Sequence, residues 1–224
     1  MPSNHPTSLA SVVVPSGALP DQPWANALHT LINQAYLYTR KDIDAFPANW
    51  GRLDPHPEKG IKGLAQELTP LGSLVVLFEG EMVVACGGFE PFRGVDWINK
   101  EKSADETLTE IFLADSSTKA QPPPPSGEII KDWDVCCFCV HPTYRRSGLS
   151  KTLLRSVEDA VKQRGGERLM ACYCIAETGD YWPRMGFETM PGSESMLKKG
   201  FTYAVGTEGL REDLHFLMGA KALT

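Results

Sequence analysis

A turn that contains two adjacent arginines, a glycine and a serine is the part of this sequence best suited to bind an anion. It lies in the stretch VHPTYRRSGLSKTLL, residues 140–154, directly after the apolar run DVCCFCV. A strand followed by a glycine-containing turn and a helix leaves the first backbone N–H groups of the helix without intrahelical partners, and the positive end of the helix dipole acts with them. This arrangement around Arg145, Arg146, Gly148 and Ser150 predicts a phosphate-binding turn.

The spacing within the turn excludes the common nucleotide-binding motifs. Lys151 and Thr152 match the end of a G-x-x-x-x-G-K-[ST] loop, but Arg145 and Ser150 stand where the two glycines of that loop belong. The G-x-G-x-x-G fingerprint of dinucleotide-binding proteins does not occur at the turn either. The predicted ligand therefore contains phosphate but is not ATP or NAD.

Hydrophobic periodicity predicts the elements that position this turn. Amphipathic helices are expected over residues 24–37, 61–68 and 149–164, and the last of these ends at the pair Gly165-Gly166. A hairpin is expected around Glu79-Gly80-Glu81, with a bulge or bend at Gly87-Gly88. Single strands are expected from Leu9, before the turn, over 168–174 and over 213–220. This order fits a mixed α/β or α+β domain.

Composition and charge narrow the class of protein. The formal net charge is −6, which argues against a nucleic-acid-binding protein because such proteins present a basic face. No run of apolar residues is long enough to span a membrane. Six cysteines occur without a secretory signal, and we expect reduced, buried thiols in the cytoplasm or nucleus rather than disulfides. Their C-C-x-C and C-x-C spacings do not match zinc knuckles, so no metal site is expected.

The predicted domain organisation has one globular unit. Residues 1–8 are expected to be a loose tail, followed by a single domain over 9–224. The polar segment of about 99–127 ends in QPPPPSG, and four consecutive prolines continue neither a helix nor a sheet. We expect a stiff surface insertion there, with a peptide-recognition ligand as the alternative.

The turn and the elements around it resemble the GNAT superfamily of acetyl-CoA-dependent N-acetyltransferases. The signature of that family is [Q/R]-x-x-G-x-[G/A] between a strand and a long helix; Arg145 and Gly148 match it, Ser150 replaces the last small residue, and YWPRMGF follows about 30 residues later. The resemblance extends from about residue 9 to 220. It implies a mostly antiparallel central sheet flanked by helices, with a β-α-β core that binds coenzyme A. The residues that it implicates in binding acetyl-CoA are Phe138, Val140, Arg145, Arg146, Ser147, Gly148, Leu149 and Ser150.

The same resemblance suggests which residues move protons. Acetylation of an amine needs a base, and Asp134 stands on the strand where several family members carry a catalytic Glu, with Asp132 as the reserve candidate. The family's usual acid is a Tyr four residues before the Gly of the closing GF, and Trp182 occupies that position. Indole cannot supply a proton as a phenol does. The neighbouring Tyr181 is therefore the candidate acid; Tyr173 is a weaker one, and water or an inefficient enzyme are the alternatives.

The sequence leaves the acceptor open. The loops YTRKDIDAFPANWGRLDPHP and GSESMLKKGFTYAVGTEG correspond to segments that border the acceptor groove in the family, and Asp42, Asp44 and Trp50 in the first of them suit a cationic amine. The expected activity is direct transfer of acetyl from acetyl-CoA to an amine of a small molecule, peptide or protein, because no Cys–His–carboxylate arrangement is evident. The alternatives are a non-catalytic acyl-CoA-binding or regulatory module, and a protein-interaction domain that acts through the prolines.

Overall fold

A computed structural model describes residues 9–94, 129–201 and 208–224. The tail predicted at 1–8 and the proline-rich insertion predicted at about 99–127 lie outside these residues. Within them the chain forms one sheet with strand order β1-β2-β3-β4-β5-β8-β6, and β7 pairs with β8 at the same edge. The strands are β1 (Leu9–Pro15), β2 (Ser73–Glu79), β3 (Met82–Pro91), β4 (Asp132–Val140), β5 (Arg168–Cys174), β6 (Glu188–Thr189), β7 (Ser195–Leu197) and β8 (Leu214–Ala222).

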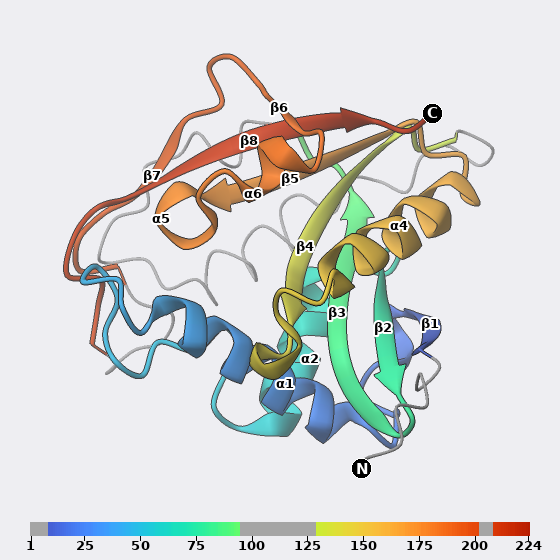
Figure 1. Cartoon of the computed structure of the whole chain (residues 1–224), viewed down its shortest axis with the longest axis horizontal. Helices are drawn as coiled ribbons and strands as arrows, with labels where there is room; N and C mark the ends of the chain where they lie inside the picture. The colour runs from blue at the N-terminus through green and yellow to red at the C-terminus, as the bar shows by residue number, and fades with distance from the viewer. Residues whose placement is uncertain (1–8, 95–128, 202–207) are drawn as a thin grey trace, which may run out of the picture.

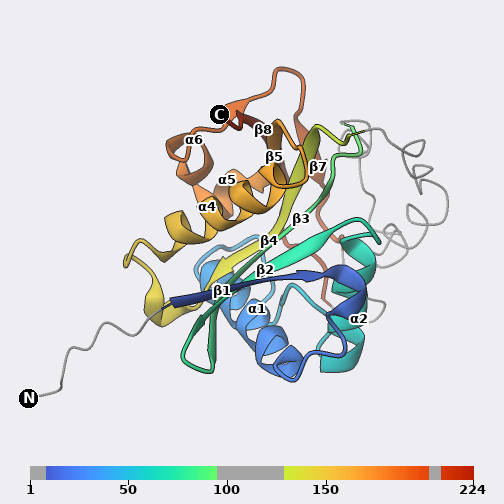
Figure 2. The same cartoon turned by 90° about the vertical axis from the view of Figure 1, so that its right-hand side faces the viewer.

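Helices cover both faces of this sheet. In Figure 2, α4 lies on one side of the strands, whereas α1 and α2 lie on the other. The helices are α1 (Ala25–Arg40), α2 (Pro57–Glu67), α4 (Leu149–Lys162), α5 (Ile175–Thr178) and α6 (Tyr181–Arg184), with short 3-10 turns at Ser16–Ala18 and Pro142–Tyr144. A mixed, mostly antiparallel sheet flanked by helices is the fold class that the sequence predicts, and the structure confirms it.

Two separate cores hold the helices to the sheet, and strand β2 shows why. Its alternate residues point to opposite faces. Val75 and Leu77 pack with Leu153 and Val157 of α4, while Val76 packs with the residues that α1 and α2 bury. Because every residue of β2 before Glu79 is buried, the strand reads as a continuous apolar run rather than an alternating one.

The predicted hairpin and its bulge are both present. Strands β2 and β3 pair antiparallel from Glu79 opposite Met82 onward, and Gly80 between them has φ of +60°. The register between β3 and β4 shifts between Cys86 and Gly88, where Gly87 faces two residues of β4. The bulge is therefore real, and the extra residue belongs to β4. A bulge bends the strand that carries it and increases its twist.

The described part of the chain contains no helix of the length and apolar character needed to cross a membrane.

Candidate active site

The site begins where β4 and β5 separate. These neighbours run parallel, and their pairing extends from Asp132 with Arg168 only to Val135 with Ala171. Beyond that point β5 stays with β8, while β4 carries the bulge and has Cys137 at φ of +47°. Figure 1 shows the two strands starting side by side near the C-terminus and then diverging. One edge of β4 from Cys136 onward is consequently open in the described structure.

Phe138 projects from the bulged part of β4 into the space between the two strands. The centroid of its ring lies 6.2 Å from the centroid of the Tyr181 ring and 5.4 Å from that of the Trp182 ring. A side chain at position 87 has no room there, because a Cβ atom added to Gly87 would lie 2.9 Å from the Phe138 ring. The glycine of β3 thus lets the bulge of β4 form and sets the direction of Phe138.

The predicted phosphate turn has the backbone that its sequence suggests. Gly148 precedes helix α4 with φ of +85°, and Arg146 has φ of +67°. Among the described residues no backbone carbonyl accepts a hydrogen bond from the amides of residues 146 to 150, and the first helical amide with an acceptor is that of Lys151, which donates to Gly148 O at 2.9 Å. The turn therefore presents a row of N–H groups at the positive end of a 14-residue helix.

The two arginines of the turn have different environments. The guanidinium of Arg145 lies over the Tyr38 ring at 4.6 Å and donates to Ala35 O at 2.9 Å and to Thr39 Oγ1 at 2.8 Å. It therefore fastens the turn to helix α1. The exposed Arg146 also borders the cavity, and the structure shows no such anchor for it.

One cavity joins this turn to the interior of the sheet. It has a volume of about 660 Å³ and runs along the separated strands. At one end it is bordered by the turn, where Ser147 is the one predicted binding residue outside its lining. Away from the turn its wall contains four carboxyl groups and three guanidinium groups, from Arg40, Arg52, Glu67, Glu90, Arg93, Asp134 and Glu177.

Asp134 lies at the inner end of this cavity, directly across from Glu90 in the pairing of β4 with β3. Asp134 is 5% exposed and Glu90 is 2% exposed. Within the described residues, Oδ1 of Asp134 and Oε2 of Glu90 have no hydrogen-bond partner. The other oxygen of Glu90 accepts a hydrogen bond from Arg93 at 2.9 Å. The site thus holds two buried carboxyl groups, and each of them has an unused acceptor oxygen.

Burial changes the acidity of this pair. It raises the pKa of Asp134 from 3.8 to about 7, and the Arg93 guanidinium only partly opposes that rise. It raises the pKa of Glu90 from 4.5 to about 8, where the charge of Asp134 adds to the effect of burial. A carboxyl with a pKa near neutrality is protonated and deprotonated readily at neutral pH, which is the property that proton transfer requires.

The raised pKa values predict a pH-dependent stability. Both groups bind a proton more tightly in the folded than in the unfolded chain, so the free energy of unfolding falls as pH rises from about 4 to about 8. Asp134→Asn, which cannot ionise, should make that fall smaller by about 2–4 kcal/mol, since one pKa unit corresponds to about 1.4 kcal/mol. Urea unfolding at the two ends of this pH range measures it. The exposed Glu188→Gln is the control, and equal slopes in all three proteins would contradict the assignment.

Tyr181 is the candidate acid, and the cavity contains its side chain. Its hydroxyl is buried and makes no hydrogen bond to a described residue. Ser150, the last residue of the phosphate turn, lies near enough to lower the pKa of Tyr181, but burial has the larger effect and raises it. The phenol therefore stays protonated at neutral pH and lies next to the turn.

Trp182, in the usual position of the family's Tyr, has a packing role. It is 6% exposed, and its ring contacts those of Phe138, Tyr173 and Phe187 at centroid distances of 5.4, 6.4 and 5.0 Å. It is thus the centre of an aromatic cluster that seats α6 against β4 and β5.

The other candidates from the sequence have different surroundings. The reserve base Asp132 is not in the cavity wall; it binds Arg168 through two hydrogen bonds of 2.7 and 2.6 Å. Tyr173 borders the cavity, but its hydroxyl lies 3.2 Å from Thr189 Oγ1. Asp42 and Asp44 are exposed and outside the cavity wall, so the prediction that they suit the acceptor is not supported, whereas Trp50 is in the wall.

All six cysteines are free thiols, and Cys86, Cys137, Cys139 and Cys174 are buried. Cys136 and Cys172 are partly buried in the cavity wall. Burial raises the pKa of both thiols, and the nearby carboxylates raise it further. Neither thiol is therefore activated as a nucleophile.

Sequence reasoning missed Glu90 and the arginines Arg40, Arg52 and Arg93 of the cavity wall. Glu90 had a signal in the sequence, since GGFEPF places a single carboxylate within an apolar strand, where an unpaired charge is costly. Arg40 had none: it is buried at the end of α1 between the rings of Tyr36 and Phe46 and pairs with Glu177 of α5. That ion pair joins elements far apart in the sequence.

Comparisons with known proteins agree with the fold. No curated protein matches the chain in sequence. The fold resembles that of the PaiA N-acetyltransferase from Thermoplasma acidophilum, solved in complex with coenzyme A, with a TM-score of 0.54, 11% identity and coverage of 96% of this chain and 99% of that chain. It also resembles the ribosomal-protein-S18-alanine N-acetyltransferase from Escherichia coli, with a TM-score of 0.52, 15% identity and coverage of 97% and 95%.

At these identities the two structures establish the fold alone. The family follows from the sequence itself, because the family model for GNAT acetyltransferases matches residues 35–187. This range includes the separated strands, the phosphate turn with α4, and the aromatic cluster around Trp182. The chain therefore belongs to the acetyltransferase (GNAT) family.

Proposed function

We propose that the protein transfers the acetyl group of acetyl-CoA directly to the nitrogen of an amine. The observation that carries this proposal is the single cavity that connects the row of free amides before α4 with the buried carboxyl of Asp134. The first feature suits a diphosphate, and the second suits removal of a proton from an amine. Family membership supports the same reaction class.

The donor would lie along β4. The diphosphate of coenzyme A would bind the amides of residues 146 to 150, with Arg145 and Arg146 adding positive charge nearby. Ser147 would help to shape this turn, since its hydroxyl donates to Tyr144 O at 2.6 Å. Leu149, 5% exposed, anchors the start of α4 in the core. The amide-rich pantetheine arm would pair with the open edge of β4 beside Phe138 and Val140. The fold neighbour solved with coenzyme A supports this choice of cosubstrate.

The transfer needs two proton movements. Asp134 takes a proton from the acceptor ammonium and later releases it to solvent, and the neutral nitrogen attacks the thioester carbonyl. A C–N bond forms and the C–S bond breaks. Tyr181 gives its proton to the departing sulfur, and a proton from the acylated nitrogen returns to Tyr181 through solvent. The products are the amide, free coenzyme A and one proton.

Tyr181→Phe tests the assignment of the acid. The ring and its contacts with Phe138 and Trp182 are kept, and only the hydroxyl is lost. We expect kcat to fall by about 100-fold, the lower end of what a general acid contributes, with KM for acetyl-CoA nearly unchanged. Steady-state kinetics measures this, with Tyr173→Phe as the matched control, because that substitution removes a hydroxyl that lies 3.2 Å from Thr189 Oγ1. An unchanged kcat would assign protonation of the thiolate to water.

A non-catalytic acyl-CoA-binding module is the second candidate function. The observation that favours it is Trp182, because the position that usually carries the family's Tyr is filled by a residue packed into the aromatic core. Release of free thiol from acetyl-CoA across a panel of amines, with the acetylated product confirmed by mass, separates the two. Turnover supports the transferase, whereas coenzyme A binding without turnover on any amine supports the module.

The free state of all six cysteines fits a reducing compartment, and we place the protein in the cytoplasm or nucleus on that ground.

A further inference from the structure

Glu90 is a buried carboxyl in the cavity to which the proposed transfer step assigns no role. It lies opposite Asp134 on adjacent antiparallel strands. Side chains paired in this way leave the same face of the sheet with their Cβ atoms about 4.5–5.5 Å apart. Both residues border the cavity and both are more than nine-tenths buried.

The two carboxyl groups have capacity to bind a ligand. One oxygen of each, Oε2 of Glu90 and Oδ1 of Asp134, makes no hydrogen bond to a described residue. A buried acceptor left without a donor is costly, and proteins fill such positions with a partner. The partner that satisfies two adjacent carboxylate oxygens is a cation with several N–H donors.

The charges of the cavity wall indicate whether the ligand is a cation or an anion. Away from the turn, each of the three guanidinium groups of the cavity wall lies in an ion pair with a carboxylate: Arg40 with Glu177, Arg52 with Glu67, and Arg93 with Glu90. Asp134 forms no ion pair with a described residue, so the described part of the wall away from the turn has one negative charge in excess once all of its carboxyl groups are ionised. The additional cations of the cavity wall, Arg145, Arg146 and Lys151, are at the turn.

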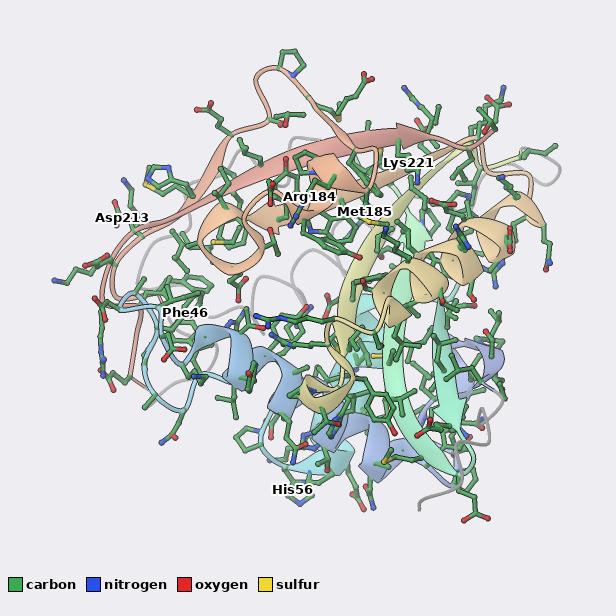
Figure 3. The ribbon with its side chains drawn as sticks, viewed as in Figure 1. Phe46, His56, Arg184, Met185, Asp213 and Lys221 are labelled. Carbon is green, nitrogen blue, oxygen red and sulfur yellow. The ribbon has the colours of Figure 1, made fainter. Side chains whose placement is uncertain are left out.

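The cavity wall is apolar farther along β5. Beyond Cys172, which lies near Asp134, it contains Cys174 and the side chains of a small hydrophobic cluster: Phe46, Trp50, Leu197, Leu210, Leu214 and Phe216. Phe46 lies beyond the end of α1 and below α5 in the view of Figure 3. A ligand that enters here buries apolar surface against aromatic and aliphatic side chains.

We propose that Glu90 and Asp134 together bind the ammonium group of the acceptor, and that the acceptor is a primary amine on an apolar or aromatic body without an acidic group. This inference rests on the proposed transferase function and specifies its acceptor class. Asp134 takes the proton that makes the nitrogen nucleophilic. Binding of the ammonium displaces the proton of Glu90, and the resulting carboxylate holds the nitrogen in place, so Glu90 is a specificity-determining residue.

The other titratable groups around this pair are few. Glu67 at the end of α2 raises the pKa of both carboxyls, and Arg93 lowers it. The thiols of Cys136 on β4 and Cys172 on β5 also lie within electrostatic reach, and burial keeps them protonated. Arg52 neutralises Glu67. A proton released when an ammonium binds therefore comes from Asp134 or Glu90.

An amine series tests the acceptor class. We expect kcat/KM for 2-phenylethylamine to exceed that for phenylalanine by about 100-fold, because the added carboxylate faces the two acids and like charges at a buried site cost several kcal/mol. Cadaverine should also be poor, since its second ammonium meets the apolar wall. A preference for phenylalanine or cadaverine would overturn the inference and leave acetyl transfer itself intact.

Glu90→Gln tests the residue. We expect its kcat/KM for 2-phenylethylamine to fall by about 10- to 100-fold, mostly through KM for the amine, with KM for acetyl-CoA unchanged. Glu90→Asp, which keeps the charge on a shorter chain, should recover part of the loss. Glu188→Gln, an exposed strand glutamate outside the cavity wall, is the matched control. If Glu90→Gln keeps the wild-type KM for the amine and the same preference over phenylalanine, the assignment of Glu90 is wrong.

Binding without chemistry separates this inference from the proposed function. Calorimetry of 2-phenylethylamine with the coenzyme A complex, in two buffers of different ionisation enthalpy near pH 7, reports the protons released on binding. We expect release by the wild type and clearly less by Glu90→Gln. Binding with proton release but no turnover on any amine supports the ammonium site and contradicts the transferase. No binding of the amine to the complex overturns the ammonium site.

Discussion

The Asp134→Asn variant is expected to lose at least 100-fold of the wild-type kcat, within the range of about 10²–10⁴ that a positioned general base contributes. The amide has the shape of the carboxyl but cannot accept the proton of the acceptor. The side chain is buried at the inner end of the cavity, with one oxygen free of described partners, so the substitution breaks no hydrogen bond of that atom. Thiol release at saturating acetyl-CoA and amine measures kcat directly.

The pH dependence of the rate distinguishes the loss of a general base from other causes of a low kcat. The active form of Asp134 is ionised, and burial raises its pKa to about 7. The rate should therefore be constant above that pH and fall about tenfold for each unit below it. The rate of Asp134→Asn should show no such fall below that pH. Both proteins are assayed with the same amine, so that the titration of the amine itself contributes equally to the two profiles.

Asp132→Asn is the matched control, because Asp132 lies two residues away on β4 but pairs with Arg168 outside the cavity wall. An exposed ion pair of this kind contributes little, and we expect kcat within about twofold of the wild type. If Asp134→Asn retains both the wild-type kcat and the fall in rate at low pH, the base is another group. Equal losses in the two variants would indicate a disturbed strand rather than a lost base.

The sequence was sufficient to predict the backbone of the phosphate turn, because its determinants are local. The free amides depend on a glycine at the start of α4, on an amphipathic helix behind it and on a strand before it, and all of these lie within residues 132–162. The hairpin of β2 and β3 was equally readable, since its two apolar runs flank a glycine turn. Elements whose partners are close in sequence leave their pattern in a single window.

The buried carboxyls and ion pairs of the cavity wall could not be predicted in the same way, because these residues meet only in the folded chain. The position of Glu90 beside Asp134 depends on the strand register that places the two residues opposite each other. The burial of Arg40 likewise depends on its ion pair with Glu177, which is distant in the sequence. The short strand Ser195–Leu197 has no strong apolar pattern and exists because it pairs with β8, so the sequence suggested only a loop there. Long-range pairing overrides weak local propensity.

Ser150 and Trp182 depart from the family pattern, and the structure shows how both are accommodated. Ser150 is small enough to leave the amides of the turn exposed, and its hydroxyl lies beside that of Tyr181. Trp182 fills the centre of the aromatic cluster, which leaves the adjacent Tyr181 with its hydroxyl in the cavity wall. The two replacements thus lie on either side of the proposed acid and are compatible with its role.

The second large effect is expected at Gly148, where Asp and Asn form a matched pair of substitutions. Gly148 has φ of +85°, and a Cβ atom added to it meets nothing within 4 Å. Among side chains other than glycine, Asp and Asn tolerate this left-handed backbone best. Both also suit the N-cap of a helix. Gly148→Asp and Gly148→Asn should therefore fold with similar stability, and Asp should gain slightly more from the helix dipole.

Their affinities for coenzyme A should differ strongly. The aspartate places a negative charge among the amides that we assign to the diphosphate, and two unit charges about 4 Å apart repel by about 4 kcal/mol at an effective dielectric constant of 20. Even half of this energy corresponds to a loss of affinity of about 30-fold, and the whole of it to about 1,000-fold. Gly148→Asn adds similar bulk without charge and should lose less than about tenfold.

Calorimetric titration with coenzyme A at two salt concentrations measures both effects. Because repulsion at an exposed turn is screened by salt, the difference between Gly148→Asp and Gly148→Asn should shrink as the salt concentration rises. Pantetheine, which lacks the diphosphate, should bind the two variants equally. If the two variants bind coenzyme A with the same affinity, or if the difference persists with pantetheine, the diphosphate does not lie on this turn, and the open edge of β4 would have to bind the donor in another orientation.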